Sequence, residues 1–130
     1  MGDCVILLDT NILIQPPDVW PDDSFGSSII SLAELHFGVQ LARDEQTREL
    51  RTRRLAVLRT TFEWLQFDEY AAQSYGILAE TVWRSRPAHS RNKDIMIAAQ
   101  AHALGVPLMT RNPKDFTLVS DLVHVIAVPV

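Results

Sequence analysis

The chain has 130 residues, 47% of them hydrophobic, and a formal net charge of -4. This length predicts one globular domain over residues 1–130, and the negative charge disfavours a protein that coats nucleic acid through a broad basic surface. No apolar stretch approaches the roughly 20 residues of a membrane-spanning helix and no signal peptide is recognisable, so we expect a cytoplasmic protein with no membrane contact.

The charges are distributed unevenly along the chain. Residues 1–42 carry six acidic residues and no Lys or Arg, whereas all 12 basic residues fall between Arg43 and Lys114. An acidic centre with basic elements around it suits a metal site whose substrate is an anion.

The first predicted element is a buried strand at residues 5–8. Its residues are apolar at consecutive positions, which is typical of a strand covered on both faces of a parallel sheet. Asp9, Thr10 and Asn11 follow directly, and the carboxyl ends of parallel strands are where α/β sheets bind ligands. Taken alone, this turn is better explained as a helix cap, because all three residue types cap helices.

Residues 12–28 are rich in Pro, Gly and Asp, which predicts a loop. A short strand at residues 28–30 then runs into a helix from Ser31 to about Ala42, with Glu34 in its first turn. Ser31 and Glu34 have the spacing of a capping box, which would give Glu34 a structural role.

The rest of the chain alternates between predicted helices and strands. Periodicity indicates helices at 44–62, 71–86 and 94–104, the last apolar nearly all round, and strands at 64–67, 106–109 and 123–128 with a polar turn at 110–116. This alternation predicts an α/β fold, a three-layer α/β/α arrangement with a mostly parallel central sheet of four to five strands.

Three acidic residues, Asp9, Glu34 and Asp94, each stand where a strand or loop meets the start of a helix. An acid inside a helix as apolar as 94–104 is costly unless it is paired or bound to a cation. Oxygen ligands with no Cys or His beside them favour Mg²⁺ or Mn²⁺ over zinc. Asp115 and Asn112 are candidates for a fourth ligand, although both also suit a simple turn.

Four blocks of sequence, in this order and spacing, resemble the PIN domain, and within it the VapC-type toxic ribonucleases of type II toxin–antitoxin (VapBC) pairs. The blocks are Leu8–Asn11, Ser31–Leu35, Asp94–Ala99 and Thr110–Phe116. The resemblance covers nearly the whole chain. The Pro-rich stretch 15–22 departs from it, since many relatives continue a helix there.

The resemblance implies a PIN-like fold in which Asp9, Glu34, Asp94 and a fourth residue hold the metal and carry catalysis. The fourth position falls in the last block, where some relatives use the site of Asn112 and others that of Asp115; we assign it to Asp115. The implied activity is an Mg²⁺-dependent endoribonuclease (Mn²⁺ is an alternative) that cleaves single-stranded regions of structured RNA, such as tRNA or rRNA, by metal-activated water. The implied partners are a VapB-type antitoxin and a second copy of the chain.

Further residues near these blocks are candidates for binding the RNA substrate. Hydroxyl, amide and cationic side chains can hydrogen-bond or neutralise phosphates, and those placed to do so are Thr10, Asn11, Arg91, Lys93, Thr110, Arg111 and Asn112.

Two other functions fit the same pattern. A catalytically inactive PIN-fold module that binds RNA or protein would keep its function after Asp9 or Asp94 is replaced by Asn. A phosphoacceptor signalling domain also clusters acids around Mg²⁺, but no predicted strand in the middle of this chain ends in Asp. A Rossmann-type nucleotide binder is disfavoured because no glycine-rich turn follows the first strand.

Overall fold

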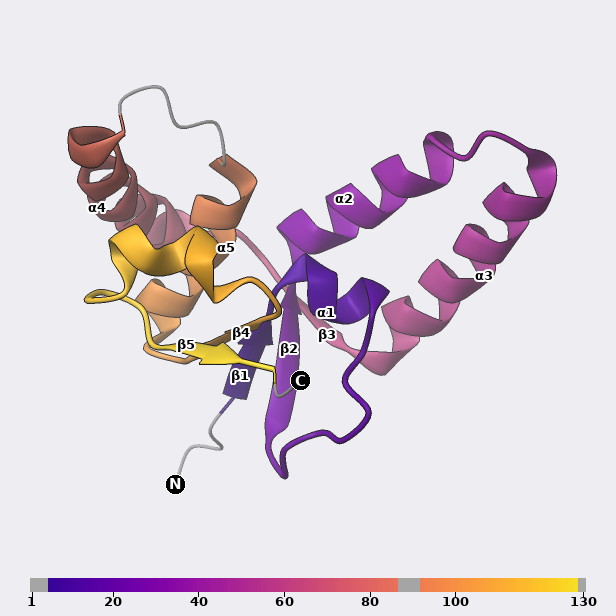
Figure 1. The fold of residues 1–130 in the computed structure, drawn as a ribbon, viewed down its shortest axis with the longest axis horizontal. Coiled ribbons are helices and arrows are strands. Elements are labelled where there is room, and N and C mark those ends of the chain that lie inside the picture. The colour runs from indigo at the N-terminus through magenta and orange to yellow at the C-terminus, as the bar shows by residue number, and fades with distance from the viewer. Residues whose placement is uncertain (1–4, 87–91, 129–130) are drawn as a thin grey trace.

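An entirely parallel sheet of five strands forms the centre of the computed structural model, which describes residues 5–86 and 92–128 (Figure 1). The strands lie side by side in the order β3-β2-β1-β4-β5. Their bounds are β1 Val5–Leu8, β2 Ser24–Ser28, β3 Glu63–Leu65, β4 Leu108–Thr110 and β5 Val125–Ala127. The predicted α/β fold with a mostly parallel sheet is confirmed.

The helices cover both faces of this sheet. They are α1 Thr10–Ile14, α2 Ile29–Gln40, α3 Glu45–Thr61, α4 Glu69–Ser85, α5 Asn92–Leu104 and a short 3-10 helix, η1 Pro113–Val119. Helices α4, α5 and η1 share one apolar cluster with one face of the sheet, and α1 and the end of α3 share a second cluster with the other. Helix α2 starts at the carboxyl edge of the strands and runs away from the sheet, and α3 runs back toward β3 (Figure 1).

The two clusters follow from the alternation of side chains along β1. Leu7 and its partner in β4, Leu108, face α4 and α5, whereas Leu8 and Met109 face α1 and α3. All four are buried, and burying an aliphatic side chain of this size contributes about 1.5–3 kcal/mol. Strand β1 is therefore covered on both sides, as its run of consecutive apolar residues predicted.

Strand β2 lies inside the stretch predicted to be a loop, so that prediction was wrong between Ser24 and Ser28. Four of its five residues are Ser or Gly, yet it lies between β1 and β3. A Cβ atom on Gly26 would lie 3.3 Å from the Leu65 side chain and 3.5 Å from that of Val5. Small residues therefore let the neighbouring side chains close over this strand.

Helix α2 begins earlier than predicted. Its N-cap is Ser28, whose Oγ accepts a hydrogen bond from the backbone N of Ile30 at 2.9 Å. Of the strand predicted at residues 28–30, only Ser28 lies in a strand, as the last residue of β2, because Ile29 and Ile30 begin α2. Ser31 and Glu34 do not form a capping box. Glu34 lies in the second turn of α2, which leaves its side chain available for contacts outside the helix.

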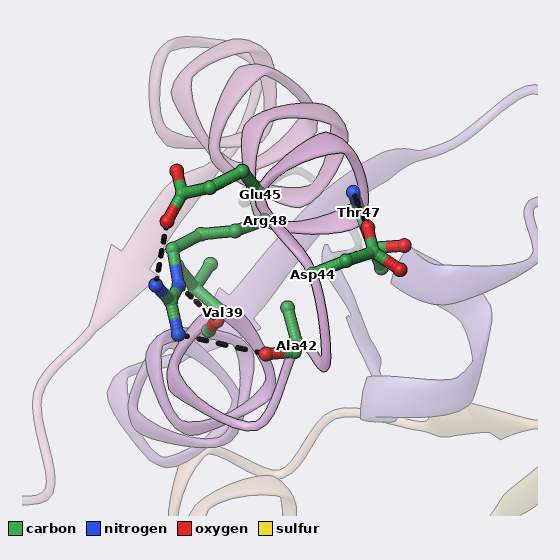
Figure 2. A network of polar contacts seen from close by, with 6 residues as sticks. All are labelled: Val39, Ala42, Asp44, Glu45, Thr47 and Arg48. Carbon is green, nitrogen blue, oxygen red and sulfur yellow. Dashed lines mark hydrogen bonds and ion pairs between the residues drawn. The ribbon is translucent and has the colours of Figure 1, made fainter.

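Two arginines of α3 connect the end of α2 to the start of α3. The Arg48 guanidinium lies 3.5 Å from the carbonyl oxygens of Val39 and Ala42 (Figure 2). Arg51 donates to the Gly38 carbonyl at 2.6 Å. Both arginines therefore bind carbonyls at the C-terminus of α2, where the helix dipole favours a cation.

Helix α5 is the most buried helix, as predicted, with six buried residues between Ile95 and Ala101. It ends at Gly105, whose φ of 66° is a left-handed conformation that glycine adopts without strain. Within the described residues, no helix is long and apolar enough to cross a membrane.

Candidate active site

Asp9 lies at the carboxyl end of β1 and is 4% exposed. It is the N-cap of α1, and its Oδ1 accepts from the backbone N of Thr10 at 2.9 Å. Its Oδ2 accepts from the Thr110 hydroxyl at 2.8 Å and from Asn11 Nδ2 at 3.3 Å. The cap interpretation is therefore correct for one oxygen, while the other is held by β4, about 100 residues away along the chain.

The electrostatic environment of this carboxylate is unfavourable to its charge. Burial is the main cause that raises the pKa of Asp9 from 3.8 to about 6, and the hydrogen bond from Thr110 opposes the rise. The negative charges of Asp94 and Glu34 raise it further. Acids from two other segments, α5 and α2, therefore act on Asp9 at the carboxyl end of β1.

Glu34 is held to the first residue of α1 by the hydroxyl group of Thr10. Thr10 Oγ1 donates to Glu34 Oε1 at 2.7 Å and lies 2.7 Å from Ser31 Oγ. Because Thr10 has one hydroxyl proton and gives it to Glu34, Ser31 donates to Thr10. This chain of hydrogen bonds fixes the Glu34 carboxylate beside the turn that carries Asp9.

Asp94 lies in the first turn of α5, and its side chain is half-buried. Helix α5 is packed against the sheet by its apolar residues, so the position of Asp94 is set by the core. The helix N-terminus favours a negative charge at this position by about 0.3–1 kcal/mol. Among the residues predicted as ligands, Asp9, Glu34 and Asp94 are brought together.

The fourth candidates lie in the turn after β4. Asp115 is half-buried in the first turn of η1, and its backbone N donates to the Asn112 carbonyl at 3.0 Å. The Asn112 side chain is exposed, and its backbone N donates to Thr110 Oγ1 at 3.0 Å. Both residues build the turn, and a metal-binding role for Asp115 stays a prediction.

Several predicted substrate contacts are engaged within the protein. Asn11 donates to Thr110 Oγ1 at 3.2 Å and accepts from the backbone N of Arg111 at 3.1 Å. The Arg111 side chain donates from Nε to the Gln15 carbonyl at 2.7 Å. Thr110 is fully buried, with its proton directed to Asp9. These residues therefore form the frame that holds Asp9.

Of the two remaining basic candidates, the structure describes Lys93, in the first turn of α5. The Lys93 side chain is exposed, and its Nζ lies 5.8 Å from the ring centroid of Phe37 in α2. Arg91 lies outside the described residues. Lys93, a predicted substrate contact, therefore directly precedes Asp94 in the chain, and its side chain lies against α2.

The chemistry of these donors fits a hard divalent cation. Asp9, Glu34 and Asp94 supply carboxylate oxygens. A bound cation would offset both the burial that chiefly raises the pKa of Asp9 and the smaller effect of the two neighbouring negative charges. Across residues 5–86 and 92–128, no group of three or more His, Cys, Asp and Glu side chains already has the geometry of a metal site. Binding would therefore require these side chains to rearrange.

Two residues that hold this site together were missed by the sequence analysis. Ser31 was assigned to a capping box, and Gln100 was counted as part of an apolar helix. Gln100 is 2% exposed; it donates to the carbonyls of Leu65 and Gln66 at 3.0 Å and accepts from Ser28 Oγ. A lone amide in an apolar helix was the signal that pointed to a buried polar contact.

Comparison with known proteins gives a consistent result for sequence and structure. No protein-family model matches the chain. Ribonuclease VapC1 of Haemophilus influenzae strain R2866 is 30% identical over 131 residues, which cover 91% of this chain and 94% of that protein. Ribonuclease VapC2 of Rickettsia felis is 26% identical, covering 92% and 95%.

Solved structures of toxin–antitoxin systems share this fold. A chain of VapBC-5 from Mycobacterium tuberculosis aligns with a TM-score of 0.81 and 28% identity, covering 98% of this chain and 99% of that chain. A chain of VapBC2 from Rickettsia felis, bound to a DNA fragment from its promoter, aligns with a TM-score of 0.76 and 25% identity, covering 95% and 98%.

Proposed function

Because the chain belongs to the VapC family of PIN-domain ribonucleases, we propose that it is a divalent-metal-dependent endoribonuclease and the toxin of a VapBC pair. The metal is Mg²⁺, with Mn²⁺ as a substitute, and the substrate is a single-stranded region of a structured RNA such as tRNA or rRNA.

The observation that carries this proposal is the electrostatic coupling of three acids at one edge of the sheet. Asp9 is buried, and its pKa is raised in part by Asp94 and Glu34, which come from α5 and α2. Structural caps do not require this convergence, since a cap interacts with its own helix. A cluster of mutually repelling carboxylates is typical of a site for a cation.

In the proposed mechanism, Asp9, Glu34 and Asp94 hold the cation, and Asp115 is the fourth candidate. When bound, the cation activates water for attack on the phosphodiester and stabilises the leaving oxygen. Thr110 and the Thr10 backbone hold the two oxygens of Asp9, while the Thr10 hydroxyl holds Glu34. Lys93, exposed beside Asp94, is placed to neutralise a flanking phosphate.

A cavity of about 350 Å³ between α1, α2 and α3 supports an antitoxin as the partner. Its lining combines apolar side chains with one acidic and two basic residues: Ile14, Leu35, Leu55, Leu58, Glu34, Arg51 and Arg54. A partner segment that lies in this cavity can direct a basic side chain at the acidic cluster and so block it. The two solved VapBC assemblies support a partner of the VapB type.

Replacing Asp94 by Asn tests the chemistry. We expect the unaltered protein to cut members of a labelled RNA panel in Mg²⁺ or Mn²⁺, and EDTA to abolish cutting. Loss of a ligand carboxylate should lower the cleavage rate of Asp94→Asn at least about 100-fold.

Asp121→Asn is the matched control, because Asp121 is an exposed carboxylate outside the acidic cluster. It should cut RNA at the normal rate. The proposal is wrong if Asp94→Asn keeps the activity of the unaltered protein, or if the unaltered protein cuts no RNA with either metal; the latter result would favour an inactive binding module.

A further inference from the structure

A cavity of about 390 Å³ lies between the end of α4, the first turn of α5 and η1. We propose that it binds one unpaired nucleotide of the RNA substrate, with the base inside and its phosphates at the rim on Arg86 and Lys114. This inference rests on the ribonuclease function proposed above and assigns the subsite next to the cleaved bond.

The floor of this cavity is apolar and belongs to the core. Val82, Ile95, Phe116 and Val119 line it, and each side chain is at most 7% exposed. Cavities of roughly 300–1,000 Å³ accommodate small ligands, so this one has room for a planar base. An unstacked base buries its apolar faces in such a place, which is how single-stranded nucleotides are commonly held.

Two cations stand at the rim. Arg86 is the C-cap of α4, and Lys114 is the second residue of η1; both line the cavity and have exposed side chains. A guanidinium can bind phosphate oxygens in a bidentate manner, and an ammonium adds a point charge beside it. The charge at the rim therefore matches the backbone of a nucleic acid.

The charge inside the cavity sets the orientation of the nucleotide. Asp115 also lines the cavity, and in the metal-free protein its carboxylate disfavours a phosphate between the apolar walls. A neutral base avoids this repulsion, while its phosphates remain outside with Arg86 and Lys114. The interior of the cavity therefore binds the base, and the rim binds the phosphates of the same nucleotide.

The cavity adjoins the acidic cluster through the first turn of α5. Ile95, on the cavity floor, directly follows Asp94, whose charge acts on Asp9. Helices α5 and η1 pack in the same apolar cluster, and two residues separate the end of β4 from the start of η1. A nucleotide bound in this cavity is therefore placed next to the phosphodiester that is cleaved at the acidic cluster.

The rim is tested by binding of a 5′-fluorescent RNA oligonucleotide in EDTA, where no cleavage occurs. We expect Arg86→Ala/Lys114→Ala to weaken binding about tenfold and to reduce the salt slope by about one unit or more. Arg53→Ala/Arg84→Ala is the matched control, since it removes two exposed arginines that are paired to Glu49 and Glu80. It should change binding less than about twofold.

The interior is tested with the RNA that the unaltered protein cuts best, carrying an abasic residue at each position in turn. We expect an abasic residue at one position beside the cleaved bond to raise KM with little effect on kcat. Thr117 is an exposed residue on the lining of the cavity, so the larger side chain of Thr117→Trp should fill the cavity. In that variant, normal and abasic RNA should have the same KM. Thr117→Ala, which leaves the cavity open, should preserve it.

The proposal is overturned if the two double variants weaken binding equally, or if the abasic penalty persists in Thr117→Trp. It is also overturned if the unaltered protein binds no RNA in EDTA, or if the rim variant impairs only binding of a protein partner. Failure of the ribonuclease function itself gives a different pattern, in which RNA binding depends on Arg86 and Lys114 but no RNA is cut in Mg²⁺ or Mn²⁺.

Discussion

At the scale of single residues, the carboxylate of Asp9 accepts several hydrogen bonds, yet its buried position disfavours its negative charge. Its oxygens accept hydrogen bonds from Thr10, Asn11 and Thr110, which would ordinarily stabilise the ionised form. Burial outweighs these contacts and holds its pKa at about 6. The metal-free protein is therefore destabilised when Asp9 ionises.

This imbalance makes stability depend on pH. Between about pH 4 and pH 6 the folded protein retains a proton that the unfolded chain releases, so the free energy of unfolding falls as pH rises through this window. The loss is complete above the folded pKa and amounts to about 3 kcal/mol for a shift of about two units. In EDTA, Asp9→Asn should raise the free energy of unfolding at pH 8 by about 2 kcal/mol and change it little at pH 4.

Urea denaturation at both pH values measures this difference, with Asp121→Asn as the control because that carboxylate is exposed. If Asp9→Asn destabilises the protein equally at pH 4 and pH 8, the carboxylate contributes through its hydrogen bonds alone and the electrostatic account fails.

Sequence analysis predicted the carboxylates of the candidate site more accurately than the hydrogen bonds that position them. Asp9 and Asp94 were identifiable because an acid beside an apolar run is unusual, and parallel strands predict a shared edge. Ser31 was misassigned because Ser and Glu three residues apart also form a capping box. Its partner Thr10 is 21 residues away, a distance that local patterns do not encode.

At the scale of elements, helices were predictable where one stripe of apolar residues faces the core. Leu55 and Leu58 of α3 are buried, as their spacing predicted. Strand β2 was not predictable from periodicity, because Gly26, Ser27 and Ser28 carry no apolar signal and are buried by their neighbours. Its position between two strands is a tertiary effect that overrides propensity.

Gln100 joins three elements and provides a test at this scale. Gln100→Leu leaves the carbonyls of Leu65 and Gln66 and the hydroxyl of Ser28 without their partner. Since each buried unsatisfied polar group costs about 1–3 kcal/mol, the free energy of unfolding should fall by about 3 kcal/mol.

Denaturation of Gln73→Leu, on the exposed side of α4, supplies the comparison and should leave stability within about 0.5 kcal/mol. Equal stability of Gln100→Leu and the unaltered protein would show that the buried amide does not hold α5 to β3 and α2.

At the scale of the whole molecule, the acids lie on three segments between residues 9 and 94, so a bound cation would stabilise the fold as a unit. We expect saturating Mg²⁺ or Mn²⁺ to raise the Tm of the unaltered protein by about 5 °C or more. Asp94→Asn should lose most of this rise, whereas Asp121→Asn should keep it. An equal rise in all three proteins would place the cation elsewhere.

The pairing of β1 with β4 has a consequence for synthesis. Leu8 lies beside Met109, and the hydroxyl that steadies Asp9 belongs to Thr110. A ribosome must therefore translate past residue 110 before this carboxylate has its partner. A nascent chain that already displays Asp9 and Glu34 is still an incomplete enzyme, so the order of synthesis delays activity until β4 can join the sheet.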